Sequence, residues 1–113
     1  MCDPDTLQKL LRAVRGHAVD YFGNDLEKVI LYGSYARKDA DDESDVDIMI
    51  LVRQTREQLA LARKAWNRFG TGLDLEYNVL TSFQLQDSET FEQWKHILPF
   101  YQNVLREGVV FDA

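Results

Sequence analysis

The chain has only one cysteine, Cys2, so it can form no internal disulfide and has no cysteine-rich zinc site. It has no apolar run that approaches the ~20 residues needed to span a bilayer. Its first ten residues carry aspartates where a secretory signal would carry basic residues, so we expect no signal peptide. We therefore expect a cytoplasmic protein that has no membrane contact.

The chain also has few positively charged residues. It has 13 lysines and arginines but 19 aspartates and glutamates, for a formal net charge of -6. Proteins that bind DNA or RNA non-specifically neutralise phosphates with lysine and arginine, so we expect neither nucleic acid as a partner. The composition is 45% hydrophobic, which suits a folded chain. The length of 113 residues fits a single domain, 1–113, without a separate substrate-recognition domain.

Hydrophobic periodicity predicts an α/β fold in the order α-β-α-β-α-β-α-α-β. Asp3 and Pro4 are typical of a helix start, and apolar residues recur at helical spacing to about Phe22. Residues 46–52 form an apolar run that fits a strand buried on both faces. Further strands are predicted at 29–32, 73–81 and 109–111, and further helices at 34–40, at 55–69, from a cap at Ser88 or Thr90 to about Ile97, and from Pro99 to Glu107.

Two acidic residues, Asp45 and Asp47, stand at the entrance of the 46–52 strand. Their i and i+2 spacing directs both side chains to one face, where two unpaired carboxylates repel each other. A divalent cation relieves this repulsion, and carboxylate oxygens are hard ligands suited to Mg²⁺. Asp74 and Glu76 repeat the spacing in the predicted 73–81 strand. If the two strands are neighbours, one of these acids would complete a three-carboxylate cluster of the kind used in two-metal phosphoryl transfer.

Gly33 and Ser34 lie at the predicted junction of a strand and a helix. Backbone amides and a helix N-terminus favour an anion at such a junction. Glycine permits close approach of a phosphate, and serine adds a hydroxyl donor. Together with the carboxylates, these residues describe a site that holds a triphosphate against metal ions.

The segment GSYARKDADDESDVDIMI, residues 33–50, resembles the signature of the nucleotidyltransferase superfamily related to DNA polymerase β. That signature combines a Gly-Ser pair, a nearby arginine and a Ser-Asp-x-Asp about ten positions later. The chain is similar to the minimal nucleotidyltransferases of prokaryotes, including the MntA-like antitoxins that pair with HEPN-domain toxins, and the strong match covers residues 29–52. The resemblance implies a small nucleotidyltransferase fold, with a mixed β-sheet of about three to four strands flanked by helices.

The resemblance also implies a role for each matched position. ATP would be the nucleotide donor, and two Mg²⁺ ions would be the cofactor. Arg37 has a second interpretation as an ion-pair partner of the acidic loop, and Ser44 a second one as a residue that orders this loop. Lys38 departs from the family, because many relatives have glycine there. The implied nucleotide-binding residues are Gly33, Ser34, Arg37 and Ser44, and the implied catalytic and metal-binding residues are Asp45 and Asp47 with either Glu76 or Asp74.

Three functions are compatible with these residues. The first is an enzyme that moves a nucleoside monophosphate, AMP from ATP, onto a hydroxyl of a partner protein, as expected of an antitoxin that modifies a HEPN-type toxin. The second is a binding module that neutralises its partner by covering it. The third is an adenylyltransferase for small molecules such as aminoglycosides, acting as a homo-oligomer.

The remaining polar residues suggest less specific roles. His17 and His96 each lack a ligand partner four residues later, so we interpret both as structural or solvent-facing. Four basic residues lie off the apolar stripe of the 55–69 helix, where they either solubilise the surface or meet an acidic partner. These residues are Arg56, Arg63, Lys64 and Arg68.

Overall fold

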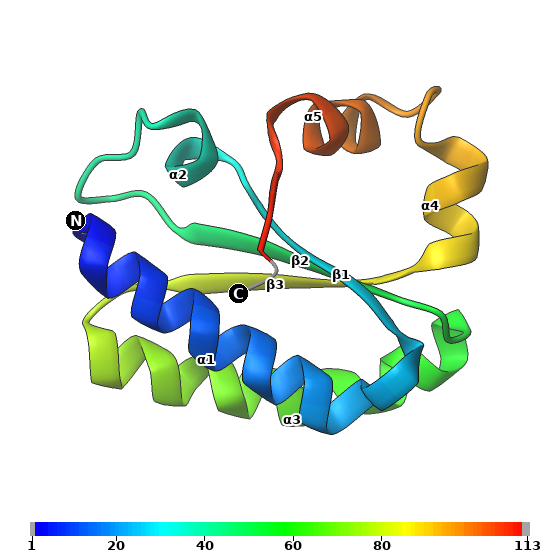
Figure 1. Cartoon of the computed structure of the whole chain (residues 1–113), viewed down its shortest axis with the longest axis horizontal. Helices are drawn as coiled ribbons and strands as arrows, with labels where there is room; N and C mark the ends of the chain where they lie inside the picture. The colour runs from blue at the N-terminus through cyan, green and yellow to red at the C-terminus, as the bar shows by residue number, and fades with distance from the viewer. Residues whose placement is uncertain (1, 112–113) are drawn as a thin grey trace.

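The computed structural model describes residues 2–111, which form a four-stranded mixed sheet with helices on both faces (Figure 1). The strand order is β3-β2-β1-β4. The elements are α1 Pro4–Phe22, η1 Gly23–Asp25, β1 Leu26–Tyr32, α2 Ser34–Arg37, β2 Val46–Val52, α3 Arg56–Tyr77, β3 Thr81–Asp87, α4 Ser88–Trp94, α5 Pro99–Glu107 and β4 Val109–Val110. This architecture confirms the predicted fold class.

The direction of the strands follows from the connections between them. β1 is antiparallel to both β2 and β4, whereas β2 and β3 are parallel. A parallel pair needs a long crossover, and the 22-residue helix α3 supplies it. Consequently β2 and β3 both begin at the same end of the sheet, the end where α2 and the acidic loop lie (Figure 1).

Helix α1 begins as its sequence predicts. Asp3 accepts a hydrogen bond from the backbone N–H of Thr6 at 2.8 Å, and Pro4 occupies the first helical position. Gly23, with φ of 57°, ends the helix in a conformation that glycine adopts without steric cost.

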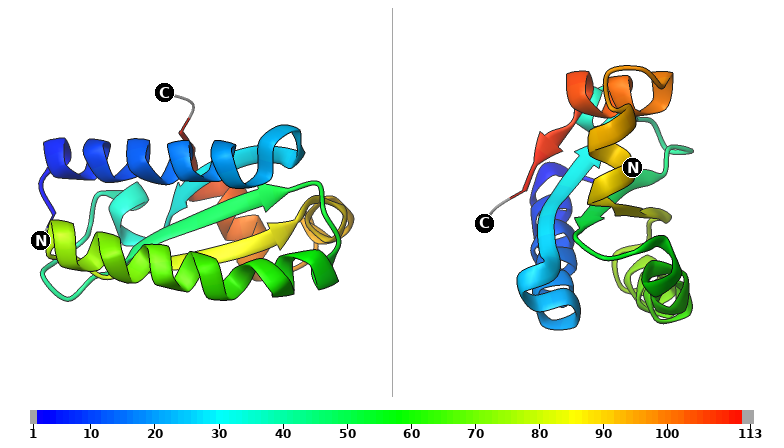
Figure 2. Two further views of the ribbon diagram at one scale, coloured as in Figure 1. Left: turned by 90° about the horizontal axis from the view of Figure 1, so that it is seen from below. Right: turned by 90° about the vertical axis from the view of Figure 1, so that its right-hand side faces the viewer.

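Two apolar clusters hold the layers together. The larger one lies between the sheet and the pair α1 and α3, which Figure 2 shows running along the same face. Its largest member is Trp66, only 1% exposed, whose ring meets Phe22 and Phe83. The smaller cluster joins the opposite face to α4 and α5 through Phe91 and Val104. Strand β2 contributes to both clusters, which confirms that it is buried on both faces.

The prediction of a strand at 73–81 is wrong, because α3 continues to Tyr77 and the third strand begins at Thr81. The sequence FGTG suggested a helix end, but Gly70 instead lets α3 pack closely on β3, since an added Cβ would lie 3.0 Å from the Phe83 ring. The helix ends at Asn78, which adopts the left-handed conformation with φ of 54°.

The remaining boundaries differ less. The cap of α4 is Asp87, rather than Ser88 or Thr90 as predicted, and its carboxylate accepts from the N–H of Thr90. Helix α5 begins at Pro99 and ends at Glu107 as predicted. Within residues 2–111, no helix is long and apolar enough to cross a membrane.

Candidate functional site

Asp45 and Asp47 lie at the entrance of β2, at the sheet end that carries the acidic loop. Asp45 is exposed just before the strand, and Asp47 is half-buried within it. In the sheet, Asp47 pairs with Tyr32 of β1 and with Ser82 of β3. The predicted pair of acids is therefore present, with one member held in the sheet between two hydroxyl-bearing neighbours.

The charge of Asp47 is poorly compensated. Burial raises the pKa of Asp47, the Asp45 carboxylate raises it further, and the Arg37 guanidinium only partly opposes both effects. Burial, together with the negative charge of Asp47, also raises the pKa of Tyr32 to about 12. Burial is the larger cause of both pKa shifts, and the smaller cause is a neighbouring negative charge that a cation would offset.

Gly33 forms the turn between β1 and α2, directly beside Asp47. Its φ of 76° favours glycine, and an added Cβ would overlap the Asp47 carboxylate. The absence of a side chain at position 33 therefore lets the carboxylate of β2 and the backbone of the turn come together. These are the two predicted parts of the site.

The short helix α2 begins immediately after this glycine. The Gly33 carbonyl accepts from the N–H groups of Ala36 and Arg37, and Ser34 is the first helical residue. Lys38 ends the helix with φ of 66° and ψ of 30°, a left-handed conformation. This conformation gives a physical reason for a preference for glycine at position 38.

Arg37 forms ion pairs on both sides of the turn. Its Nε donates to Asp39 and its Nη1 to Glu107 at the end of α5, each at 3.1 Å. The contact with Asp39 confirms that Arg37 pairs with the acidic loop. The contact with Glu107 adds a link from α2 to α5, 70 residues away in the sequence.

Ser44 orders the loop that leads into β2. Its hydroxyl accepts from the N–H of Asp41 at 3.0 Å and donates to the Asp41 carboxylate, which also accepts from the N–H of Glu43. The predicted ordering role of Ser44 is therefore confirmed.

Asp74 and Glu76 lie on α3, so the strand geometry that suggested a third carboxylate does not exist. Asp74 is half-buried, and its Oδ1 accepts from both the N–H and the hydroxyl of Thr81, at 2.9 and 2.8 Å. Glu76 is exposed. Asp74 thus fixes the start of β3, a role that the sequence did not suggest.

The true third strand presents no carboxylate beside Asp47. The described residues Thr81–Asp87 carry Ser82 opposite Asp47 and Gln84 two pairs further along, opposite Met49. Within residues 2–111, no group of three or more His, Cys, Asp or Glu side chains is placed to hold a metal ion. The expected three-carboxylate cluster is therefore contradicted.

The two remaining acids still fit a hard cation. Mg²⁺ is commonly bound by one or two carboxylates together with substrate phosphates and water, so a third protein ligand is not required. Asp47, whose pKa burial and Asp45 raise, is the kind of carboxylate that gains most from a nearby cation.

Sequence reasoning missed Tyr32 and Phe100 as neighbours of this site. Tyr32 ends β1 opposite Asp47, and its ring meets that of Phe100 on α5 edge-to-face at 5.6 Å. The position of Tyr32 directly before Gly33 was the available signal. Of the two histidines, His17 stacks on Phe69 at 3.9 Å and His96 is exposed, as interpreted.

The chain is similar in sequence to a known protein family and to individual proteins. Residues 19–111 match the family model described as "Polymerase beta, Nucleotidyltransferase". Two proteins of Methanocaldococcus jannaschii are similar in sequence. "Putative protein adenylyltransferase MJ0604" is 35% identical over 75% of this chain and 77% of its own length. "Putative protein adenylyltransferase MJ0141" is 44% identical over 50% of this chain and 56% of its own length, so the match spans little more than half of that relative.

A solved structure is also similar. It is described as "Structure of putative minimal nucleotidyltransferase", and it superposes with a TM-score of 0.50 at 25% identity, over 89% of this chain and 92% of that one.

Proposed function

Because the chain belongs to the polymerase beta nucleotidyltransferase family, we propose that it moves AMP from ATP onto a hydroxyl of a partner protein. Nucleotidyl transfer follows from the family, whereas AMP and the protein acceptor extend the names of the two archaeal relatives to this chain. The observation that carries the proposal is the Asp47 carboxylate lying against the Gly33 turn, with Asp45 two residues away.

Each part of this site has a proposed task. The turn formed by Gly33 and Ser34 binds the phosphates of ATP through backbone amides and the serine hydroxyl. Asp45 and Asp47 hold one or two Mg²⁺ ions, which supply positive charge against the negative charge of the phosphates. Ser44 keeps the loop before β2 in place. Arg37, whose ion pair with Asp39 holds it at the end of α2, contributes positive charge toward the phosphates.

The missing carboxylate on β3 narrows the class of acceptor. In an alcohol, the attacking oxygen needs a base, and β3 offers only Ser82 and Gln84 near Asp47 within its residues Thr81–Asp87. A phenol, with a pKa of about 10, loses its proton far more readily. This difference supports a tyrosine of the partner protein as the acceptor.

We propose further that the partner is a HEPN-type toxin and that the chain acts as its antitoxin. The support is the resemblance of this chain, through its segment 33–50, to the minimal nucleotidyltransferases that include the MntA-like antitoxins of HEPN-domain toxins.

The test incubates the protein with α-labelled ATP, Mg²⁺ and a lysate of the source cell. We expect one labelled protein band with the wild type and none with Asp47→Asn. Glu43→Gln is the matched control, since it removes one exposed carboxylate from the same loop and should leave the label unchanged. Equal labelling by Asp47→Asn and the wild type would contradict the proposal, as would the absence of any labelled band.

A second function, neutralisation of the partner by covering it, is favoured by one observation. The site holds two carboxylates and β3 holds none beside them, which fits a nucleotide site that has lost its activity. The discriminating variant is Asp45→Ala with Asp47→Ala, expressed together with the partner. Neutralisation by modification predicts that this variant fails to protect cells, whereas neutralisation by covering predicts full protection.

A further inference from the structure

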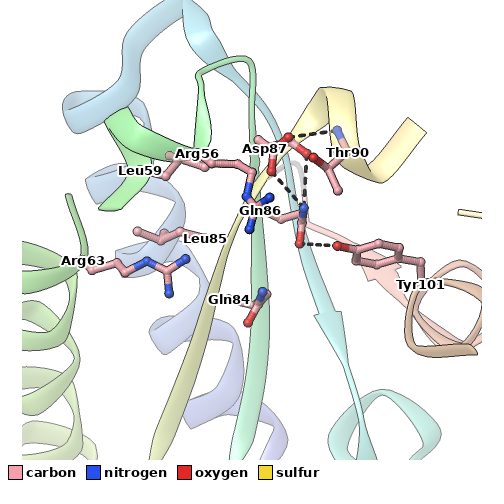
Figure 3. A pocket seen from close by; sticks show the side chains of 9 residues that line it. All are labelled: Arg56, Leu59, Arg63, Gln84, Leu85, Gln86, Asp87, Thr90 and Tyr101. Atoms are coloured by element: carbon pink, nitrogen blue, oxygen red, sulfur yellow. Dashed lines mark hydrogen bonds between the residues drawn. The ribbon is translucent and has the colours of Figure 1, made fainter. Parts of the chain in front are cut away.

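A separate polar hollow lies at the far end of the sheet from Asp45 and Asp47. Its volume is about 220 Å³, and Figure 3 shows Arg56 and Arg63 reaching into it from α3, with Tyr101 on the other side of Gln86. The parallel direction of β2 and β3 separates the two sites, because Asp47 lies near the beginning of β2 and this hollow lies along the end of β3. The hollow therefore takes no part in the proposed nucleotide site.

The polar groups in the floor of the hollow are already paired. The Tyr101 hydroxyl donates to the side-chain Oε1 of Gln86 at 3.0 Å. The Gln86 amide donates to Asp87, whose second oxygen accepts from the N–H of Thr90. Gln86 and Asp87 are 5% and 7% exposed, so they form a rigid floor of the hollow. Their polar groups are not available to bind a ligand.

The two arginines are not paired. Within residues 2–111, neither the Arg56 nor the Arg63 side chain forms an ion pair or a hydrogen bond. They are seven residues apart, so they lie on the same face of α3, separated by about 10 Å along the axis. In a chain of net charge -6, this is a local concentration of unused positive charge.

The two arginines lie beside the unpaired edge of strand β3. β3 is an edge strand of the sheet, at the opposite side from β4. The Leu80 carbonyl accepts from the N–H of Val46, so Leu80 and every second residue after it direct their backbone groups to β2. The backbone groups of Phe83 and Leu85 therefore face outward, where no strand within the described residues pairs with them.

The edge is closed at both ends of β3. The N–H of Thr81 also faces outward, but it donates to the Asp74 carboxylate. At the other end, the Asp87 backbone carbonyl accepts from the Gln86 side-chain amide, and α4 begins at Ser88. An added strand would therefore pair from Phe83 to Leu85, alongside the arginines.

From these observations we infer that the outer edge of β3 binds an extended acidic peptide segment as a fifth strand, with its carboxylates facing Arg56 and Arg63. Main-chain bonds to Phe83 and Leu85 provide the pairing, and the arginines select the side chains. Alternate residues of a strand are about 6.6 Å apart, so glutamates at i, i+2 and i+4 span the separation of the two arginines.

A second copy of this chain is the poorer occupant of the edge. Antiparallel pairing of two β3 strands would place both α3 helices on one face of a continuous sheet. The arginines of one copy would then meet those of the other, and like charges placed opposite each other are destabilising.

The test uses the full chain and a nine-residue peptide of alternating glutamate and threonine, with termini blocked. We expect saturable binding that weakens with added salt, together with slower hydrogen exchange of the Phe83 and Leu85 amides. The same peptide with lysine in place of glutamate should not bind.

The variant Arg56→Glu with Arg63→Glu should weaken binding roughly tenfold or more. Its matched control is Lys64→Glu with Arg68→Glu, which changes the net charge equally on the same helix but outside the hollow. Equal loss in both variants would overturn the inference, because it would indicate non-specific attraction. Unchanged exchange at Phe83 and Leu85 would overturn it too, as would a dimer of the free chain joined through β3.

Discussion

The Asp47 carboxylate occupies the space in which a side chain of Gly33 would begin. β1 and β2 pair such that Tyr32, the residue before Gly33, stands opposite Asp47. The turn that we propose binds phosphates and the acid that we propose binds metal thus lie directly beside each other. Several of the predictions below depend on this contact.

Gly33→Ala should lower the free energy of unfolding by about 2–4 kcal/mol, because the methyl group overlaps Asp47 and alanine disfavours a φ of 76°. Urea unfolding measures the change. Gly16→Ala is the control, since position 16 lies within α1 with nothing within 4 Å of an added Cβ, and it should gain up to about 1 kcal/mol. A loss at position 16 equal to that at 33 would contradict this explanation.

Asp47→Asn should abolish transfer and yet stabilise the fold at neutral pH. The pKa of Asp47 is raised in the folded state, so its ionised form costs stability once the pH exceeds the folded pKa. Below the ordinary value of 3.8 the carboxyl is protonated in both states, and the difference between variant and wild type should vanish. Unfolding measured from pH 3 to pH 7 checks the sign; a variant less stable at pH 7 would contradict it.

Asp74→Ala should lower the free energy of unfolding by about 1–3 kcal/mol, because the N–H and hydroxyl of Thr81 lose their acceptor. Asp74→Asn retains an acceptor oxygen, so it should keep both most of the stability and the transfer activity. Glu76→Gln, at an exposed position, should change neither. Loss of transfer in a well-folded Asp74→Asn would identify Asp74 as the third acid after all.

Lys38→Gly should raise the free energy of unfolding by about 0.5–1 kcal/mol. The left-handed conformation at this position costs a non-glycine residue about 1–2 kcal/mol, and the greater freedom of glycine in the unfolded chain returns part of this gain. Lys38→Ala keeps the Cβ and should give no gain. Equal stabilisation by both substitutions would show that the lysine charge, rather than the backbone, is the cause.

His17 should make stability depend on pH below its ordinary pKa of 6.5. Burial lowers the pKa of His17, with Asp20 opposing, so the unfolded chain binds a proton more readily. The stabilisation is complete above pH 6.5 and is lost as the pH falls through the lowered pKa of the folded state. His17→Phe keeps a ring against Phe69. It should reduce the change of the unfolding free energy between pH 5 and pH 7, and an unchanged dependence on pH would contradict this.

Local signals in the sequence were sufficient for most elements and for the core of the site. The cap at Asp3, the apolar run of β2 and the spacing of Asp45 and Asp47 are each encoded within a few residues. Such features depend on dihedral preference and on side-chain alternation, which need no knowledge of the rest of the chain.

The third strand depended on tertiary structure, because LDLEYNV fits both an alternating strand and the last turns of a helix. Packing makes this segment helical up to Tyr77, because Leu73 is buried in the core on the continuing helical face and Gly70 lets α3 lie against Phe83. The long-range pairings followed from the same packing. Ser82 stands beside Asp47, Glu107 meets Arg37, and the edge of β3 lies open beside Arg56. The sequence alone determined which residues are the candidates for the chemistry, and only the fold decided which of them meet, because contacts between distant residues depend on how whole elements pack.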